Sequence, residues 1–264
     1  MHLGHVVNAI YVWGLARRRG AQVLLRIEDH DRIRCRPEFE AALLEDLDWL
    51  GFVADAGRSP VLRQSDSPEA YQEALNSLRR RHHVYACVCS RRDIGGERYA
   101  GRCRELGLPE TAGCGLRLQL APGREAFEDG LLGPVEQDPA DQCGDLLLRD
   151  RDGHWTYQFA VTVDDWRQGV TLVVRGEDLV SSTGRQMALA RMLGRPAPPV
   201  FVHHPLILKP DGDKLSKSSG DTGVRQLRAA GLSPAEVIGR AASAVGLIRR
   251  YRPLDHAEVD ALFP

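Results

Sequence analysis

The sequence lacks the features that most often identify nucleotide-binding, secreted and membrane proteins. Neither a Walker-type loop nor a Gly-x-Gly-x-x-Gly stretch occurs in its 264 residues, so the two commonest nucleotide fingerprints are missing. The longest N-terminal apolar stretch, residues 6–16, is too short to span a bilayer, and its arginines follow it, whereas a secretory signal has its positive charges first. Six cysteines are too few for a disulfide scaffold, which favours a cytoplasmic protein with reduced thiols free to bind metal.

The charge balance lacks an excess of either sign. With 35 basic and 36 acidic residues the formal charge is −1, so no global positive field indicates a nucleic-acid binder. RNA contacts would have to come from local patches such as residues 17–19 or 79–81, and each patch is equally typical of a helix end. A hydrophobic content of 43% suffices for the core of one large domain or two small ones.

Hydrophobic spacing and capping residues predict an alternation of helices and strands. The expected helices cover residues 5–19, 37–51, 67–82, 183–193 and 233–245. The expected strands cover residues 23–27, 145–149, 155–161 and 170–174. This order predicts an α/β fold with a parallel sheet, which binds ligands beyond the carboxyl ends of its strands. Residues 84–145 read as irregular and hold five of the six cysteines, so we expect an insertion with a metal site there.

The first motif is His2-Leu3-Gly4-His5 at the start of the first predicted helix. A helix N-terminus favours phosphate, two imidazoles can donate hydrogen bonds to it, and glycine allows a close backbone approach. Taken alone the motif is weak, because a histidine beside the initial methionine is equally typical of a frayed terminus.

The second motif is Lys214-Leu215-Ser216-Lys217-Ser218. Its ammonium and hydroxyl groups suit a mobile loop that clamps a polyphosphate, although a solvated lysine-rich loop is as good an interpretation of this motif alone. In this order and spacing, the two motifs resemble the HIGH and KMSKS signatures of class I aminoacyl-tRNA synthetases. The resemblance implies a Rossmann-like catalytic domain that binds ATP, accompanied by Mg²⁺.

The resemblance also implies roles for individual residues of the two motifs. Catalysis would rest on His2, His5 and Lys217, which would stabilise charge on the phosphates. The ATP-binding set would comprise His2, Gly4, His5, Lys214, Ser216 and Lys217.

Further segments resemble the glutamyl and glutaminyl branch of the family. In residues 26–31, Arg-Ile-Glu-Asp-His-Asp, the resemblance implies that Glu28 receives the amino group of the amino acid. A surface acidic turn is the alternative. In residues 157–165 and 174–178, it implies that Tyr157 contacts glutamate and that Arg175 pairs with its side-chain carboxylate. An arginine fork suits a carboxylate, although by itself Arg175 would read as an ordinary strand-end residue.

The cysteine pattern is similar to the zinc site of the glutamyl-queuosine members of that branch. Cys87, Cys89, Tyr99 and Cys103 would supply three thiolates and one phenolate, which closes a tetrahedral structural site for one zinc ion per chain. By spacing alone the fourth ligand could also be Cys114, His82 or His83, and buried free thiols are a further alternative. The remaining cysteines, Cys35, Cys114 and Cys143, are expected to be structural.

Three departures refine the resemblance. Val161 stands where glutamyl-tRNA synthetases tend to have asparagine, which favours the queuosine-specific members. Only a short segment follows Ser218, so we expect no anticodon-binding domain. The family's first strand, which precedes the histidine signature and supplies an arginine and a serine to the glutamate site, has no counterpart before His2.

The expected organisation has four parts. Residues 1–83 form the first half of the nucleotide-binding domain, without its first strand, and residues 146–220 form the second half of that domain. Residues 84–145 form an inserted zinc-binding acceptor-type subdomain. A short helical segment, residues 221–264, ends the chain. The expected function is ATP-dependent activation of L-glutamate and its transfer to queuosine in tRNA(Asp), by a monomer without membrane contact. Two alternatives remain: a truncated glutamyl-tRNA synthetase that charges tRNA(Glu), and a non-catalytic zinc-stabilised RNA-binding module.

Overall fold

A computed structural model describes residues 1–30, 35–208 and 223–264. Its α-helices are α1 (Leu3–Arg18), α2 (Pro37–Leu50), α3 (Pro68–Arg81), α4 (Arg91–Ile94), α5 (Pro139–Gln142), α6 (Tyr157–Arg167), α7 (Val180–Leu193), α8 (Val224–Ala229) and α9 (Pro234–Ala244). Its strands are β1 (Arg26–Ile27), β2 (Leu62–Arg63), β3 (Val84–Cys87), β4 (Gly115–Leu118), β5 (Glu125–Asp129), β6 (Gly133–Gln137), β7 (Leu146–Arg149), β8 (Leu172–Gly176) and β9 (Val200–His204). Among the described helices, none has the length and apolar character needed to cross a membrane.

Most of the predicted helices are confirmed, and their ends follow local chemistry. Helix α2 begins at Pro37, and Gly51 ends it with a left-handed φ of 84° that costs glycine little. Helix α9 begins with a capping box, in which Ser233 and Glu236 each accept the other's backbone N–H. Helices α1, α3 and α7 lie where the apolar spacing predicted them.

The strand predicted over residues 155–161 is wrong, because residues 157–167 form helix α6. Thr156 has extended backbone angles and is the N-cap of the helix. The residues that follow, from Phe159 to Asp164, are all buried, so neither a two-residue nor a 3.6-residue period stands out in them. An apolar run that is buried on all sides cannot be assigned from periodicity alone.

A four-stranded sheet in the order β6-β5-β9-β8 places the carboxyl ends of two parallel strands side by side. Strands β8 and β9 are parallel, with Arg175 opposite His203 and Gly176 opposite His204. Strand β5 also pairs with β9 in parallel, and β6 joins β5 as an antiparallel hairpin. The predicted strand over residues 170–174 is confirmed as β8, whereas that over residues 23–27 is reduced to β1, which pairs with β2 in parallel.

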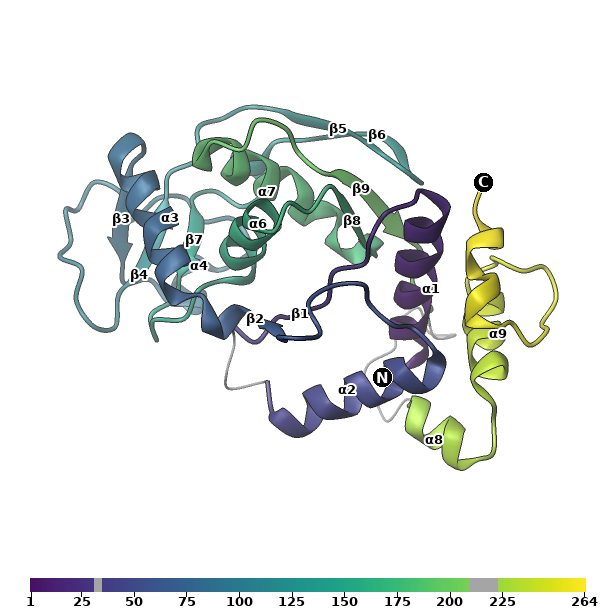
Figure 1. Cartoon of the computed structure of the whole chain (residues 1–264). Helices are drawn as coiled ribbons and strands as arrows, with labels where there is room; N and C mark the ends of the chain where they lie inside the picture. Colours follow the sequence, from purple (N-terminus) through teal and green to yellow (C-terminus); the bar gives the residue numbers. More distant parts are fainter. Residues whose placement is uncertain (31–34, 209–222) are drawn as a thin grey trace.

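Residues 84–145, which read as irregular in sequence, contain strands β3 to β6. Strands β3 and β4 form an antiparallel sheet with β7, which confirms the strand predicted at residues 145–149. Figure 1 shows this sheet with α3 and α4 at one end of the molecule, and α1, α8 and α9 at the other. The β5–β6 hairpin of the same segment belongs instead to the sheet of β8 and β9.

Helix α1 is the centre of the larger apolar core. It contacts β8, α9 and the 3₁₀ helix at His256–Leu262, and Figure 1 shows α1 beside the C-terminal helices. Val6 and Ile10 on α1 are fully buried in this core. Gly14 permits the close packing, because a Cβ atom there would lie 2.2 Å from the Phe263 ring. The first helix is thereby fixed between the sheet and the end of the chain.

Candidate active site

The histidine motif caps the N-terminus of α1. His2 is the N-cap, and its Nδ1 accepts a hydrogen bond from the Gly4 N–H at 3.1 Å, while the His5 Nδ1 accepts from the His2 N–H at 3.2 Å. The two ring centroids are 3.8 Å apart. A Cβ atom on Gly4 would lie 2.9 Å from the His2 ring, so the motif requires glycine there. Since both Nδ1 atoms accept, each neutral imidazole has its proton on Nε2, where it can serve as a donor.

The lysine motif, with Lys214, Ser216 and Lys217, lies outside the described residues. The chain re-enters the described part beside the histidine motif: Gly223 forms an antiparallel bridge with His2, and the Val224 N–H donates to the Met1 carbonyl at 2.8 Å. Gly223 and Val224 are therefore held at the N-terminus of α1.

Glu28 belongs to a charged cluster at the end of β1. Arg26 donates to Glu28 at 2.8 Å, to Asp165 at 2.9 Å and to Gln168 at 2.8 Å. Burial works to lower the pKa of Arg26, but the two carboxylates outweigh it and raise that pKa. The Glu28 side chain is 37% exposed against 14% for Asp165, so Glu28 is the carboxylate of this cluster that an incoming ammonium group can reach.

Arg175 lies at the carboxyl end of β8 and is only 7% exposed. Its Nε donates to His203 Nε2 at 3.1 Å, its Nη2 to Thr183 at 2.9 Å and its Nη1 to Gln186 at 2.7 Å. Within the described part of the chain, no carboxylate forms an ion pair with this guanidinium. Because an unpaired buried charge is costly, the arrangement is suited to an anionic ligand.

Tyr157 contacts Arg175 and senses the charge of Glu28. Its hydroxyl lies 3.4 Å from Arg175 Nη1, so the structure brings these two predicted residues together. Burial raises the pKa of Tyr157, the positive charge of Arg175 lowers it, and the negative charge of Glu28 raises it. The phenol therefore lies in the electrostatic field of both groups and stays protonated at neutral pH.

A second buried network supports His30, which precedes the undescribed residue Asp31. His30 Nδ1 lies 2.7 Å from Gln64 Oε1, and Gln64 Nε2 donates to Asp164 at 3.1 Å. Tyr71 donates its hydroxyl proton to the same Asp164 oxygen at 2.7 Å. The His30 ring is 6.2 Å from the Tyr157 ring, so the network extends to the edge of the candidate site.

The predicted metal ligands form a compact cluster, since the sulfur atoms of Cys87, Cys89 and Cys103 lie within 4.8 Å of one another. The Cys89 and Cys103 sulfurs are 3.5 Å apart, and the Tyr99 hydroxyl is 3.4 Å from the Cys87 sulfur and 3.9 Å from the Cys89 sulfur. A tetrahedral zinc site with ordinary bond lengths has edges of about 3.8 Å between sulfurs and about 3.6 Å between sulfur and oxygen. The four atoms thus fit one zinc ion.

The surroundings of the cluster shift the pKa values of its thiols in opposite directions. Hydrogen bonds, above all with Tyr99, overcome the effect of burial and lower the pKa of Cys103 to about 7, whereas burial raises the pKa of Cys89 to about 11. Arg117 donates to the Cys87 sulfur at 3.3 Å and lies over the Tyr99 ring. A divalent cation would favour the thiolate at every cysteine.

The other candidates for the fourth ligand have different partners. His82 contacts the Met192 carbonyl, His83 contacts Gln119 and Cys114 contacts Thr111.

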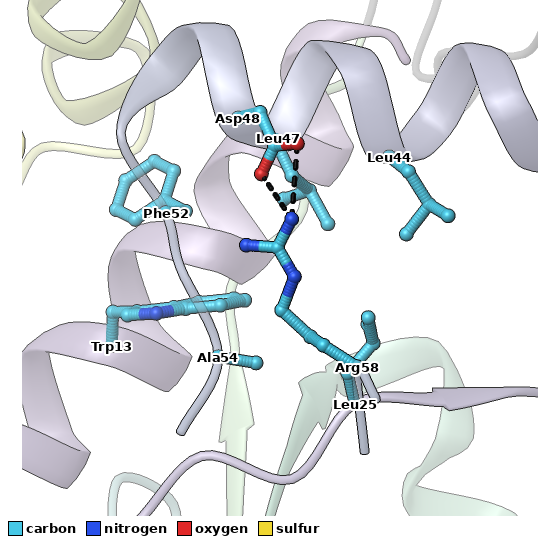
Figure 2. Close-up of a pocket in the computed structure, with 8 residues that line it drawn as sticks. All are labelled: Trp13, Leu25, Leu44, Leu47, Asp48, Phe52, Ala54 and Arg58. Atoms are coloured by element: carbon cyan, nitrogen blue, oxygen red, sulfur yellow. Dashed lines mark hydrogen bonds and ion pairs between the residues drawn. The ribbon is translucent and has the colours of Figure 1, made fainter. Parts of the chain in front are cut away.

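Two hollows among the described residues lie away from the candidate site residues. One, between α1 and α2, has a volume of about 10 Å³, and Figure 2 shows Arg58 reaching across it to Asp48 at 2.8 Å. That volume holds about one water molecule. A larger hollow of about 360 Å³ is lined by Arg240, Ser243, Ala244 and Tyr251, none of which belongs to a predicted site. The candidate site is therefore described by its polar geometry.

Comparison with known proteins decides the family. The model of the catalytic domain of class I tRNA synthetases (E and Q) matches residues 1–242. The chain belongs to this family. The class I synthetase fold accounts for the parallel pairing of β8 and β9 and for the histidine motif at the start of α1.

Relatives within the family are similar over most of the chain. A glutamyl-Q tRNA(Asp) synthetase of Rhodobacter capsulatus is 40% identical over 90% of this chain and 94% of its own length. One of Symbiobacterium thermophilum is 38% identical over 100% of this chain and 88% of its own length. A glutamate–tRNA ligase 1 of Acidithiobacillus ferrooxidans is 37% identical over 89% of this chain but only 52% of its own length.

A solved synthetase structure shares the fold. The crystal structure of a glutamate tRNA ligase from Elizabethkingia meningosepticum in complex with its amino acid superposes with a TM-score of 0.81 at 25% identity. The match covers 100% of this chain and 62% of that structure, so the chain spans less than two thirds of that protein.

Several residues beside Arg175 in the candidate site were missed by the sequence analysis. His203, Thr183 and Gln186 contact Arg175 and are all buried. The signal available for His203 was a buried apolar strand that ends in two histidines. Thr183 and Gln186 lie inside a predicted helix, where only the three-dimensional packing shows which strand residue they face.

Proposed function

We propose that the chain activates L-glutamate with ATP and transfers the glutamyl group to queuosine in the anticodon of tRNA(Asp). The observation that supports this most directly is the similarity, over 88 to 94% of their own lengths, to proteins named glutamyl-Q tRNA(Asp) synthetase. The buried guanidinium of Arg175, which forms no ion pair with a carboxylate of the described residues, supports an acidic side chain as the substrate's recognition group.

Two groups of opposite charge, Glu28 and Arg175, both act on Tyr157 and suit an amino acid with three charges. Glu28 would receive the ammonium group, Arg175 the side-chain carboxylate, and Tyr157 would contact the substrate between them. The α-carboxylate would then be held by neither of these groups. This arrangement leaves it available to the α-phosphate of ATP.

The reaction then needs positioning and charge stabilisation rather than a covalent enzyme intermediate. An oxygen of the α-carboxylate attacks the α-phosphorus, the bond to the β-phosphate breaks, and pyrophosphate leaves. His2 and His5, with Lys217 from the lysine motif, would stabilise the phosphate charge, and Gly4, Lys214 and Ser216 complete the proposed ATP set. A hydroxyl of queuosine then attacks the activated carbonyl, and AMP leaves. Mg²⁺ would accompany the ATP.

We also propose that Cys87, Cys89, Tyr99 and Cys103 hold one structural zinc ion in an inserted subdomain formed by residues 84–145. Four protein ligands leave no open position, so the ion would fix the fold of the segment and take no part in the reaction. Metal analysis of the purified chain should give about one zinc ion per chain, lost in a Cys103→Ser variant and kept in a Cys114→Ser control. If the chain is purified without zinc and all of its thiols titrate freely, the proposed zinc site is ruled out.

Glutamate-dependent exchange of pyrophosphate into ATP tests the activation step. Transfer is tested with three substrates: tRNA(Asp) with queuosine, tRNA(Asp) without it, and tRNA(Glu). We expect glutamate to be accepted only by the first. Acceptance by tRNA(Glu) would favour a glutamyl-tRNA synthetase, which the similarity to the Acidithiobacillus ligase keeps as the second candidate. No exchange and no transfer would favour an RNA-binding module.

A further inference from the structure

A buried chain of hydrogen bonds connects Arg175 to a carboxylate that it does not touch. Asp129 Oδ2 lies 2.6 Å from His203 Nδ1, and His203 Nε2 lies 3.1 Å from Arg175 Nε. The side chains of Asp129 and His203 are both 0% exposed. Thr183 completes the contact, since its hydroxyl is 3.2 Å from His203 Nε2 and 2.9 Å from Arg175 Nη2. One imidazole thus separates a buried anion from a buried cation.

The surroundings of Asp129 determine which nitrogen of His203 is protonated. Asp129 Oδ1 accepts the backbone N–H groups of Leu131 and Leu132 at 3.0 and 3.1 Å, which holds the carboxylate in one orientation. Its Oδ2 is then an acceptor that faces Nδ1, so the neutral imidazole has its proton on Nδ1 and a lone pair on Nε2. That lone pair accepts the Arg175 Nε–H.

We infer that Asp129 and His203 are positioning residues that orient Arg175 toward the substrate carboxylate, an inference that rests on the proposed function. His203 accepts from Nε of the guanidinium and Thr183 accepts from Nη2, while Nη1 lies 3.4 Å from the Tyr157 hydroxyl. The charged groups that face the imidazole are Asp129, Arg175 and Asp178. Burial lowers the pKa of His203 against the opposing effect of Asp129, which keeps it neutral near pH 7.

The Asp129→Asn substitution tests the inference because it changes one atom and reverses the tautomer. The two backbone N–H groups keep the amide oxygen in the Oδ1 position, so the amide nitrogen faces His203 Nδ1 and donates to it. The imidazole then has its proton on Nε2, pointing at the Arg175 Nε–H. We expect the KM for glutamate in pyrophosphate exchange to rise about 10- to 100-fold, as for the loss of a hydrogen bond to a charged group. The KM for ATP should stay within about twofold.

A second pair of variants keeps the test independent of Asp129. In His203→Gln the side-chain amide can reach the position of Nε2 and donate or accept there, whereas in His203→Asn it reaches only that of Nδ1. We expect the His203→Gln variant to keep a higher affinity for glutamate than the His203→Asn variant. Asp141→Asn is the matched control, because Asp141 is 84% exposed and lies outside the network. Circular dichroism checks that each variant folds.

A nitrogen NMR measurement of the histidine tautomer provides a readout that does not depend on activity. The wild-type chain should have His203 protonated on Nδ1, and Asp129→Asn should have it protonated on Nε2. A wild-type proton on Nε2, or an unchanged glutamate KM in both Asp129→Asn and His203→Asn, overturns the inference alone. A wild-type chain that neither binds glutamate nor exchanges pyrophosphate overturns the proposed function and the inference with it.

Discussion

Replacing Arg175 by lysine keeps the positive charge and removes the planar fork. The guanidinium makes three hydrogen bonds of 2.7 to 3.1 Å to Gln186, Thr183 and His203 and a longer one of 3.4 Å to Tyr157. An ammonium group has its three donors on one nitrogen, so it cannot reach these separate acceptors and a carboxylate together. Arg175→Lys therefore tests geometry at constant charge.

The expected magnitude follows from the number of hydrogen bonds lost. A lysine can keep one of the two hydrogen bonds that an arginine gives a carboxylate, and a hydrogen bond to a charged group contributes about 1.5–3 kcal/mol. At 1.4 kcal/mol for each factor of ten, the KM for glutamate should rise about 10- to 150-fold. The acceptors left unpaired on His203 and Gln186 should lower the free energy of unfolding by about 1–3 kcal/mol.

The assay is glutamate-dependent pyrophosphate exchange, with urea unfolding measured on the same protein. Arg191→Lys is the matched control, because Arg191 lies on the same helix as Thr183 and Gln186, and its fork pairs with Glu125. That pair is partly exposed, so the control should lose about 0–1 kcal/mol of stability and keep its glutamate KM. An Arg175→Lys variant whose glutamate KM equals that of the control would refute the assignment of Arg175 to the substrate carboxylate.

Three further predictions concern stability. Gly144→Ala should destabilise the chain by about 2 kcal/mol or more and weaken metal binding, because the φ of Gly144 is 66° and a Cβ atom there would lie 1.8 Å from the Tyr99 carbonyl oxygen. The control is Gly153→Ala, since Gly153 has a φ of 88° and no atom within 4 Å of the added Cβ. Urea unfolding of this control should show only the cost of the left-handed backbone, about 1–2 kcal/mol. Tyr71→Phe should cost about 1–3 kcal/mol, since the buried Asp164 loses a donor, whereas Tyr251→Phe at an exposed ring should cost almost nothing in the same assay. Burial lowers the folded-state pKa of His203 and His204 below the usual 6.5, so the unfolded chain binds more protons at these histidines than the folded chain as the pH falls below that value. The urea midpoint should therefore fall as the pH decreases from 7 to 5. A midpoint that does not change over this range would contradict the prediction.

The sequence was most informative where local chemistry decides the structure. The helix ends at Gly51 and Ser233 follow from capping rules that act within a few residues, and both were predicted. The cysteine spacing likewise led to the cluster, because Cys87 and Cys89 are separated by one residue and must lie close together.

The sequence was least informative where burial is uniform or where partners are distant in the chain. Residues 157–163 contain apolar side chains in a pattern that fits a strand as well as a helix, and only packing against α3 and α7 decides between them. His203 and Asp129 are 74 positions apart, so their 2.6 Å contact depends on the parallel pairing of β5 with β9. The order of the strands in the sheet, which no local rule specifies, therefore brings Asp129 and His203 together behind Arg175.

The same buried charge explains how this site would distinguish glutamate from glutamine. The two amino acids have nearly the same shape, so packing alone discriminates little between them. With glutamate bound, the carboxylate neutralises Arg175 and completes its hydrogen bonds. With glutamine bound, the positive charge of Arg175 gains no carboxylate from the substrate, so an ion pair is lost. One amide N–H group of glutamine also faces an N–H group of Arg175, and two donors in contact repel each other. Because His203 is neutral and Asp129 lies behind it, the described part of the chain orients Arg175 without placing a carboxylate against it. Under the proposed function the substrate carboxylate would supply that counter-ion, and this requirement would give the preference for glutamate.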